Sequence, residues 1–209
     1  MRIAVLGATG RTGQSLVAEL LRRGHELTVL ARAPEKLGAT QGAVRVVAGA
    51  STDPDALASL LKEAEAVVSA LGPTSRDSTV MSDTARVLVP AMGQRGIRRY
   101  VGVSGTGVDM EGDLKGRKDR VISSMIRRVG GVMATDKAEE YRILVASDLD
   151  WTLARPPRLV EGPPTGRVVH DAHTPGRSSS IRRADLAVFL ADVVEQGLYV
   201  RQSPFVSAG

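Results

Sequence analysis

The amino-acid sequence predicts an α/β fold with a Rossmann-like, doubly wound parallel sheet. Short apolar runs typical of strands alternate with patterns typical of helices, and the first strand leads into a glycine-rich turn. The length of 209 residues, of which 43% are hydrophobic, suits one well-buried domain and is slightly short for two. We therefore expect a single domain over residues 1–209, in which residues 155–182 form a small segment on the substrate side.

The first element is an apolar run from Ile3 to Leu6, followed by a glycine turn over residues 7–13 (GATGRTG). Apolar residues then recur at helical spacing over residues 15–21, and Gly24 ends this helix before a second strand. Such a turn lets a pyrophosphate approach the backbone amides at the positive end of the helix. The sequence therefore predicts a dinucleotide site; the alternative is the same packed unit without a ligand.

Strands and helices continue to alternate to the end of the chain. The expected strands cover residues 26–31, 43–48, 66–71, 100–104 and 150–154. The expected helices cover residues 55–63, 79–94 and 185–195, with a long helical region over 117–146 that is interrupted near Gly130 and Gly131. Ligands of such folds bind where parallel strands end, so functional residues are expected in segments 7–13, 71–74 and 104–107 and at Arg32. The glycine-rich stretch 105–116 is expected to form a mobile loop over this site.

The composition limits the partners and the chemistry. The net charge of +5 suits anionic ligands, but aromatic residues make up only 3% of the chain and the basic clusters at 95–99, 117–120 and 127–128 are scattered among acids. These clusters are therefore interpreted as solvated helix faces, and neither a nucleic acid nor a membrane is expected as a partner. The chain has no cysteine, so redox chemistry would require a cofactor. We expect a cytoplasmic protein, monomeric or homodimeric, with a small-molecule acceptor.

Five segments resemble one known family. They are residues 7–13 (GATGRTG), 28–32 (TVLAR), 78–92 (STVMSDTARVLVPAM), 101–105 (VGVSG) and 149–157 (LDWTLARPP). The chain resembles the atypical short-chain dehydrogenase/reductases that bind NAD(P), with the greatest similarity to the flavin reductase/biliverdin-IXβ reductase branch. The resemblance implies a Rossmann-like domain that binds a nicotinamide dinucleotide and passes hydride to a flat, conjugated acceptor.

The resemblance also implies particular binding residues. The pyrophosphate would be wrapped by Gly7, Thr9, Gly10, Arg11, Thr12 and Gly13. Ala70, Leu71 and Gly72 would line the adenosine and ribose side, and Val103 and Ser104 would lie beside the nicotinamide.

Arg32 indicates which cofactor is bound. NAD sites usually place an acid at the end of the second strand, whereas NADP sites place an arginine near it. Arg32 occupies this position and no acid lies between Leu27 and Pro34, so a 2′-phosphate would meet charge-assisted donors without repulsion. We predict NADPH rather than NADH; the alternative is a surface arginine without a partner.

The candidate catalytic residues are Ser104, Lys137 and Arg158. Many members of the superfamily use a tyrosine four residues before a lysine as the proton-transfer group, but Met133 stands four residues before Lys137 here. Tyr141, one helical turn after Lys137, is interpreted as a packing residue. Ser104 either orients the substrate or satisfies a turn. Arg158 replaces the histidine of the biliverdin branch and either attracts an anionic substrate or faces solvent.

These observations predict an NADPH-dependent oxidoreductase that reduces a flavin, a quinone or a similar acceptor. Such acceptors need positioning more than acid catalysis, which is compatible with the missing tyrosine. The alternatives are a non-catalytic NADP-binding redox sensor and, third, an enzyme like the nucleotide-sugar epimerases and dehydratases. His170, Asp171 and His173 are not expected to bind a metal, and Asp185 is expected in the first turn of the last helix.

Overall fold

The structure is a computed structural model that describes residues 1–73, 75, 78–110, 112–114 and 116–209. For residues 117–130 it describes the backbone and not the side chains.

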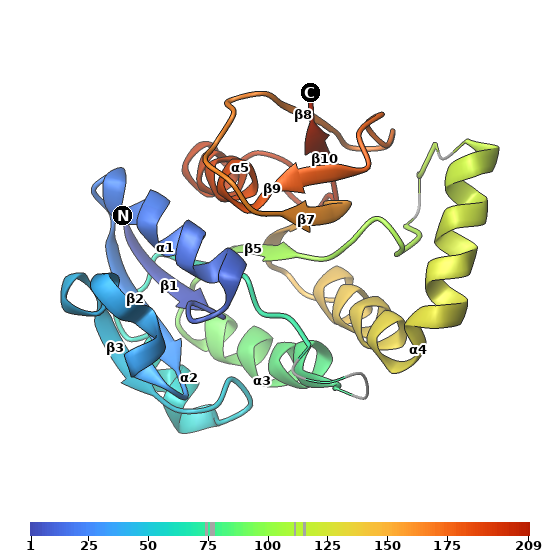
Figure 1. The fold of residues 1–209 in the computed structure, drawn as a ribbon. Helices are drawn as coiled ribbons and strands as arrows, with labels where there is room; N and C mark the ends of the chain where they lie inside the picture. Colours follow the sequence, from blue (N-terminus) through green and yellow to red (C-terminus); the bar gives the residue numbers. More distant parts are fainter. Residues whose placement is uncertain (74, 76–77, 111, 115) are drawn as a thin grey trace.

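A six-stranded parallel sheet forms the centre of the molecule (Figure 1). In order across the sheet the strands are β3 (Arg45–Ala48), β2 (Glu26–Ala31), β1 (Arg2–Leu6), β4 (Ala66–Ser69), β5 (Arg99–Val103) and β6 (Asp150–Ala154). The chain moves outward from β1 to β3 and then returns to β4 on the other side of β1. This order confirms the predicted doubly wound sheet, and its direction changes between β1 and β4, where ligands of such folds bind.

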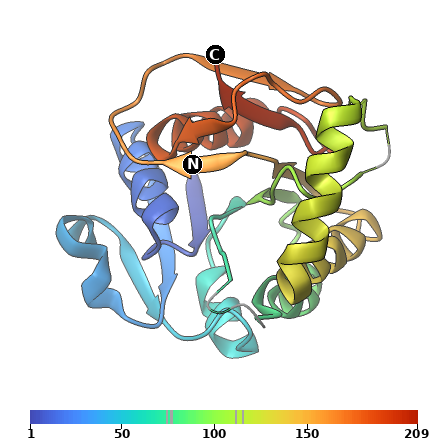
Figure 2. The ribbon, with the colours of Figure 1, turned by 45° about the vertical axis from the view of Figure 1, so that its right-hand side comes forward.

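Helices cover both faces of the sheet. On one face lie α1 (Arg11–Arg22) and α5 (Arg183–Gln196); on the other lie α2 (Pro54–Leu60), α3 (Val80–Gln94) and the second part of α4 (Arg117–Val145) (Figures 1 and 2). The side chains of β1 alternate between these layers, because Ile3 and Val5 join the core under α1 and α5 whereas Ala4 and Leu6 join the other core. The helix α4 bends at Gly131, with φ 49° and ψ −131°, as the glycine pair predicts.

The C-terminal segment adds two small sheets above the α5 side. In these sheets β7 (Arg158–Val160) runs parallel to β9 (Ser180–Arg182), and β8 (Val168–Asp171) runs antiparallel to β10 (Phe205–Ala208). The segment expected as a strand from residue 43 begins as a strand only at Arg45, because the preceding residues belong to the 3-10 helix η1 (Pro34–Ala43). None of the helices in the described ranges combines the length and apolar character needed to cross a membrane.

A cluster of charges fixes α5 against α1. Arg23 donates to Glu19 at 2.7 Å and to Asp192 at 2.7 Å, and it also pairs with Glu195. Hydrogen bonds from Arg22, together with Arg23, lower the pKa of Glu19 to about 2 despite the opposing effect of burial. The Arg23 guanidinium, which these three acids share, therefore links α1 to α5.

Candidate dinucleotide and acceptor site

Two glycines of the turn after β1 occupy positions that no side chain could share. Gly7 has φ +72°, and a Cβ placed on it would lie 2.6 Å from the backbone of both Ala70 and Leu71. A Cβ on Gly13 would lie 2.0 Å from the carbonyl oxygen of Gly7. The glycine pattern therefore reflects close backbone approach, both within the turn and between the ends of β1 and β4.

The start of α1 is open to an anion. Gly10 caps the helix in an extended conformation, with no side-chain cap and no acid in the first turn. Its N–H donates to the Gly7 carbonyl at 3.0 Å, which closes the turn on itself. Thr9 and Thr12 are half-buried beside it, and Arg11 is exposed. The backbone amides of this helix end are the donors that a pyrophosphate requires.

The residues predicted on the adenosine side lie next to this turn. The Ala70 N–H donates to the Leu6 carbonyl at 3.0 Å, so the segment after β4 continues alongside β1. Ala70 and Leu71 are half-buried and Gly72 is exposed, while Val103 is half-buried at the end of β5. The structure therefore brings these predicted residues to one edge of the sheet; Thr74 lies outside the described residues.

Arg32 follows β2 at the same edge. It is exposed and forms no ion pair or hydrogen bond with any described side chain, so its guanidinium is available to a ligand. The nearby Gln14 side chain donates to the carbonyls of Lys36 at 2.9 Å and Thr9 at 3.4 Å. Gln14 thereby joins η1 to the glycine turn and holds the two sides of the predicted cofactor site together. An open helix end, a glycine cradle and a free arginine fit a phosphorylated dinucleotide.

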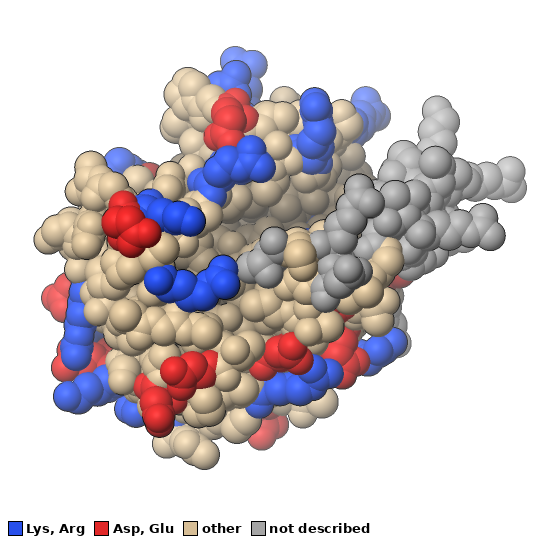
Figure 3. Space-filling view, turned by 60° about the horizontal axis from the view of Figure 1, so that its bottom comes forward, with Lys and Arg blue, Asp and Glu red and all other residues tan. Residues whose placement is uncertain are grey.

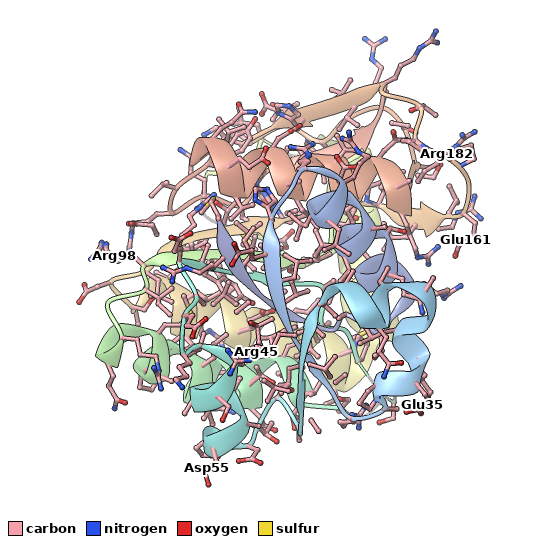
Figure 4. All side chains as sticks on the ribbon, turned by 90° about the vertical axis from the view of Figure 1, so that its left-hand side faces the viewer. Glu35, Arg45, Asp55, Arg98, Glu161 and Arg182 are labelled. Atoms are coloured by element: carbon pink, nitrogen blue, oxygen red, sulfur yellow. The ribbon has the colours of Figure 1, made fainter. Side chains whose placement is uncertain are left out.

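The surface agrees with an anionic ligand. Figure 3 shows a hollow with Lys and Arg side chains on either side of it. Figure 4 shows Glu35, Glu161 and Arg182 on the side of the molecule opposite Arg98, which precedes β5. Glu161 pairs with Arg183 at 2.7 Å and approaches Arg11 at 3.7 Å, so the C-terminal segment meets the glycine turn at this edge. The side chains of the predicted basic clusters between 117 and 128 lie outside the described residues.

Ser104 and Lys137 meet at the end of β5. The Ser104 N–H donates to the Ala154 carbonyl at 2.8 Å, and the Ser104 carbonyl accepts from Lys137 Nζ at 2.9 Å. The Ser104 hydroxyl is buried and has no hydrogen-bond partner among the described residues. Burial lowers the pKa of Lys137, and the carboxylates of Glu140 and Asp136 oppose this effect. This strand end thus carries a free hydroxyl beside a buried ammonium.

The position four residues before Lys137 offers no acid. Met133 is half-buried there, in the second part of α4. Tyr141 packs edge to face against Trp151, with 5.7 Å between the ring centroids, which confirms its expected packing role. The thioether of Met133 cannot transfer a proton, so the position four residues before Lys137 supplies no proton-transfer group.

The remaining candidates lie in the C-terminal segment. Arg158 is exposed on β7, where its N–H donates to the Ser179 carbonyl. His170 bonds the Tyr199 hydroxyl at 2.6 Å, whereas Asp171 accepts the N–H of His173 at 2.8 Å. No group of three potential ligands is arranged for a metal ion among the residues that the structure describes.

Asp185 lies in the first turn of α5, as expected, and has a further role. Its carboxylate accepts the N–H and the hydroxyl of Thr165 at 2.7 and 2.9 Å, and the N–H of Gly166 at 3.1 Å. It therefore fixes the turn between β7 and β8.

Sequence reasoning missed a buried arginine that holds the loop after Ser104. Arg155 is 1% exposed and donates to both carboxylate oxygens of Asp113, at 2.7 and 2.6 Å. It also donates to the carbonyls of Val108 and Ser203 and lies 3.7 Å from the centre of the Phe205 ring. An arginine in the otherwise apolar stretch before Pro156 was the available signal. Asp113, in the described part of the loop over residues 105–116, is thus joined by a buried ion pair to Arg155, the residue that follows β6.

The fold and the open glycine turn define a nucleotide-binding protein of the Rossmann class. The chain belongs to the NAD(P)H-binding family, whose model matches residues 7–197. It is similar to an uncharacterised chloroplast protein of Arabidopsis thaliana, with 29% identity over 98% of this chain and 74% of that protein.

Solved structures agree with the fold. A Bacillus halodurans protein assigned to the NAD-dependent epimerases/dehydratases is 26% identical, with a TM-score of 0.80 over 100% of this chain and 94% of that one. An anaerobilin reductase from Escherichia coli O157:H7 has a TM-score of 0.81 over 100% of this chain and 97% of that one, at 21% identity. The family membership makes NAD(P)H binding the basis for the function discussed below.

Proposed function

We propose that this protein is an NADPH-dependent reductase that passes hydride to a flavin, a quinone or a related conjugated acceptor. The observation that carries this proposal is the end of β5, where Ser104 and Lys137 adjoin the dinucleotide cradle but Met133 replaces the expected phenol. The geometry suits a reaction that depends on positioning rather than on a strong proton donor.

The dinucleotide would be held at the ends of strands β1, β4 and β5. The turn from Gly7 to Gly13 would bind the pyrophosphate through backbone amides, and residues 70–72 would line the adenosine side. When bound, the nicotinamide supplies the hydride. Val103, half-buried at the end of β5, would provide an apolar wall beside it.

Arg32 would select NADPH through the 2′-phosphate. Each hydrogen bond between an arginine and a phosphate contributes about 1.5–3 kcal/mol, so Arg32→Ala should weaken NADPH binding about 10- to 100-fold and leave NADH binding nearly unchanged. Arg45→Ala is the matched control, because Arg45 is also exposed but is the first residue of β3 and so lies at the opposite edge of the sheet. Calorimetric titration of both dinucleotides measures this. Equal wild-type affinities for NADPH and NADH would refute the NADPH preference.

The acceptor would be oriented by the free hydroxyl of Ser104. Reduction of a flavin or quinone leaves an anion that takes its proton from water, so the hydroxyl and the Lys137 ammonium need only orient and stabilise the developing charge. Arg158, exposed on β7, would attract acceptors that carry a phosphate or carboxylate. The hydroxyl of Ser104 is unpartnered among the described residues and Arg158 is exposed, whereas the Lys137 ammonium donates to the Ser104 carbonyl.

Turnover tests this proposal directly. Absorbance-monitored oxidation of NADPH with FMN, and separately with a soluble quinone, should be saturable and faster than with NADH. Ser104→Ala should lower kcat, whereas Ser59→Ala, an exposed serine of α2, should not. Unchanged turnover in Ser104→Ala would remove Ser104 from the acceptor site.

The names of the relatives bear on the acceptor in different ways. The Escherichia coli protein is a reductase by its name, in line with the proposed reaction type. The epimerase/dehydratase assignment of the Bacillus halodurans protein does not carry over easily, because that chemistry needs a proton-transfer group where this chain has Met133. Tight NADPH binding without turnover on any acceptor would favour the second candidate, a redox sensor, which the absence of a phenol at this position also favours.

A further inference from the structure

A buried polar cluster lies directly beneath the proposed site. The Tyr100 hydroxyl, on β5, donates to Glu140 Oε1, on α4, at 3.1 Å. Tyr100, Glu140 and the neighbouring Ser69 of β4 are each no more than 5% exposed. A Cβ on Gly102 would lie 2.9 Å from the Tyr100 hydroxyl oxygen, so the glycine makes room for this phenol. The cluster is therefore a packed part of the core between the sheet and helices α3 and α4.

One oxygen of this cluster has no partner. Glu140 Oε2 is buried and accepts no hydrogen bond from the described residues. Glu140, Tyr100 and Ser69 line a cavity of about 10 Å³, which also reaches Leu71 on the predicted adenosine side. A buried carboxylate with an unpaired oxygen lowers the free energy of unfolding. A folded protein that keeps such a group therefore does so at the expense of stability.

The charged groups that face Glu140 come from two elements. Asp136 and Lys137 flank it on α4, and Tyr100 faces it from β5. The cavity-lining side chains of α3 and β4 are uncharged. Asp136 is held elsewhere, since it accepts the N–H groups of Met81 and Ser82 at the start of α3. Lys137 is therefore the cation that responds to Glu140, and it is the residue that reaches the end of β5.

Burial raises the pKa of Glu140 to about 7, although the hydrogen bond from Tyr100 and the charge of Lys137 oppose this. The carboxyl group thus changes its charge near neutral pH while Lys137 stays at the strand end. The dinucleotide carries two negative charges on its pyrophosphate, which would lie at the ends of β1 and β4, next to β5 in the sheet. This charge attracts the ammonium and repels the Glu140 carboxylate, which favours the protonated acid.

We propose that Glu140 is a positioning residue that acts through Lys137 and couples dinucleotide binding to the uptake of one proton from solvent. This inference rests on the dinucleotide site of the proposed function and not on its acceptor. When Glu140 is ionised, its carboxylate attracts the Lys137 ammonium and competes with the bound dinucleotide. When Glu140 is protonated, this competition is absent and the ammonium interacts with the dinucleotide alone. Binding therefore draws a proton onto Glu140.

Proton uptake is measurable without any turnover. Titration calorimetry with NADH, in buffers of different ionisation enthalpy near pH 7, gives the number of protons taken up on binding. NADH lacks the 2′-phosphate that would titrate in the same range. For each unit by which binding raises the pKa of Glu140, the Kd should be about tenfold weaker well above pH 7 than well below it.

Glu140→Gln should abolish the proton uptake and flatten the pH dependence of Kd. Glu139→Gln is the matched control, because Glu139 is the adjacent acid and pairs with Arg86 and Arg142 at the surface. Tyr100→Phe provides a second variant: loss of its hydrogen bond raises the pKa of Glu140 further, so the pH of greatest proton uptake should move upward.

The outcomes separate the two proposals. Equal proton uptake by the wild type and Glu140→Gln overturns the role of Glu140 and leaves dinucleotide binding intact. An unshifted pH of uptake in Tyr100→Phe overturns it even where Glu140→Gln fails to fold. Absence of binding of both NADH and NADPH by the wild type overturns both this inference and the proposed function, and is seen before any variant is made.

Discussion

The ion pair between Arg155 and Asp113 should be worth far more to stability than its surface counterpart between Arg98 and Asp150. In both pairs one arginine donates to both oxygens of one aspartate. They differ in burial: the side chains of the first pair are 1% and 9% exposed, and those of the second are 62% and 34% exposed. The same substitution, aspartate to asparagine, therefore compares a buried pair with an exposed one, although Asp113 also accepts the Met110 N–H at 3.1 Å.

The magnitude follows from what each variant leaves behind. Asp113→Asn leaves the Arg155 guanidinium buried without a counter-charge, and breaking such a pair on one side costs about 3–5 kcal/mol. Asp150→Asn leaves the Arg98 guanidinium in water, where solvent screens the pair and its loss has little effect on stability. The first loss is a large part of the 5–15 kcal/mol that stabilises a typical domain.

Urea unfolding measures the difference. Asp113→Asn should lower the midpoint at an unchanged m-value, and for a chain of this size its Tm should fall by about 6–20 °C. Asp150→Asn should change the midpoint only slightly. Similar losses in the two variants would refute the reasoning that burial, rather than the bidentate geometry, determines the contribution.

Three further predictions test individual residues. Gly13→Ala should abolish measurable dinucleotide binding while circular dichroism stays native-like, because its Cβ would lie 2.0 Å from the Gly7 carbonyl; wild-type affinity would contradict this. Glu19→Gln should lower stability at pH 7 but much less near pH 2. Because the pKa of Glu19 is lowered from 4.5 to about 2, its ionised form stabilises the fold fully above pH 4.5, and this stabilisation is lost as the pH falls through 2. Glu140 acts in the opposite sense, since its pKa is raised from 4.5 to about 7 and its ionisation destabilises the fold as pH rises through this window, by about 3 kcal/mol. Denaturation of Glu140→Gln at pH 5 and pH 8 should show this loss removed, and an unchanged pH dependence would contradict the assignment.

The sheet was predictable because its signals are local. Val67-Val68 and Val101 lie in short apolar runs that a parallel strand buries on both faces, and all are fully buried. The glycine turn is equally local, since Gly7 and Gly13 belong to one turn and contact each other within it. A local pattern needs no knowledge of the topology, so the fold and the cofactor side followed from the residues in order.

The buried polar contacts were not predictable in this way. The Arg155 to Asp113 pair spans 42 positions and the Tyr100 to Glu140 bond spans 40, so only the completed topology brings the partners together. Glu139 and Glu140 are adjacent acids in one helical pattern, yet the first is paired at the surface and the second is 5% exposed. A step of one residue turns a helix by about 100°, and the sequence alone does not show which of two adjacent acids faces the core.

This difference also divides the candidate site. The predicted cofactor half consists mainly of backbone at strand ends, and solved structures at 21–26% identity share the fold that forms these ends. The proposed acceptor half would depend on side chains, namely Ser104 directly after β5, Lys137 on α4 and Arg158 on β7. A fold can host different substrates through different side chains at its site, so family membership supports NAD(P)H binding by this chain but does not identify the acceptor. Turnover of Ser104→Ala on several acceptors therefore tests the part of the proposed function that family membership leaves open.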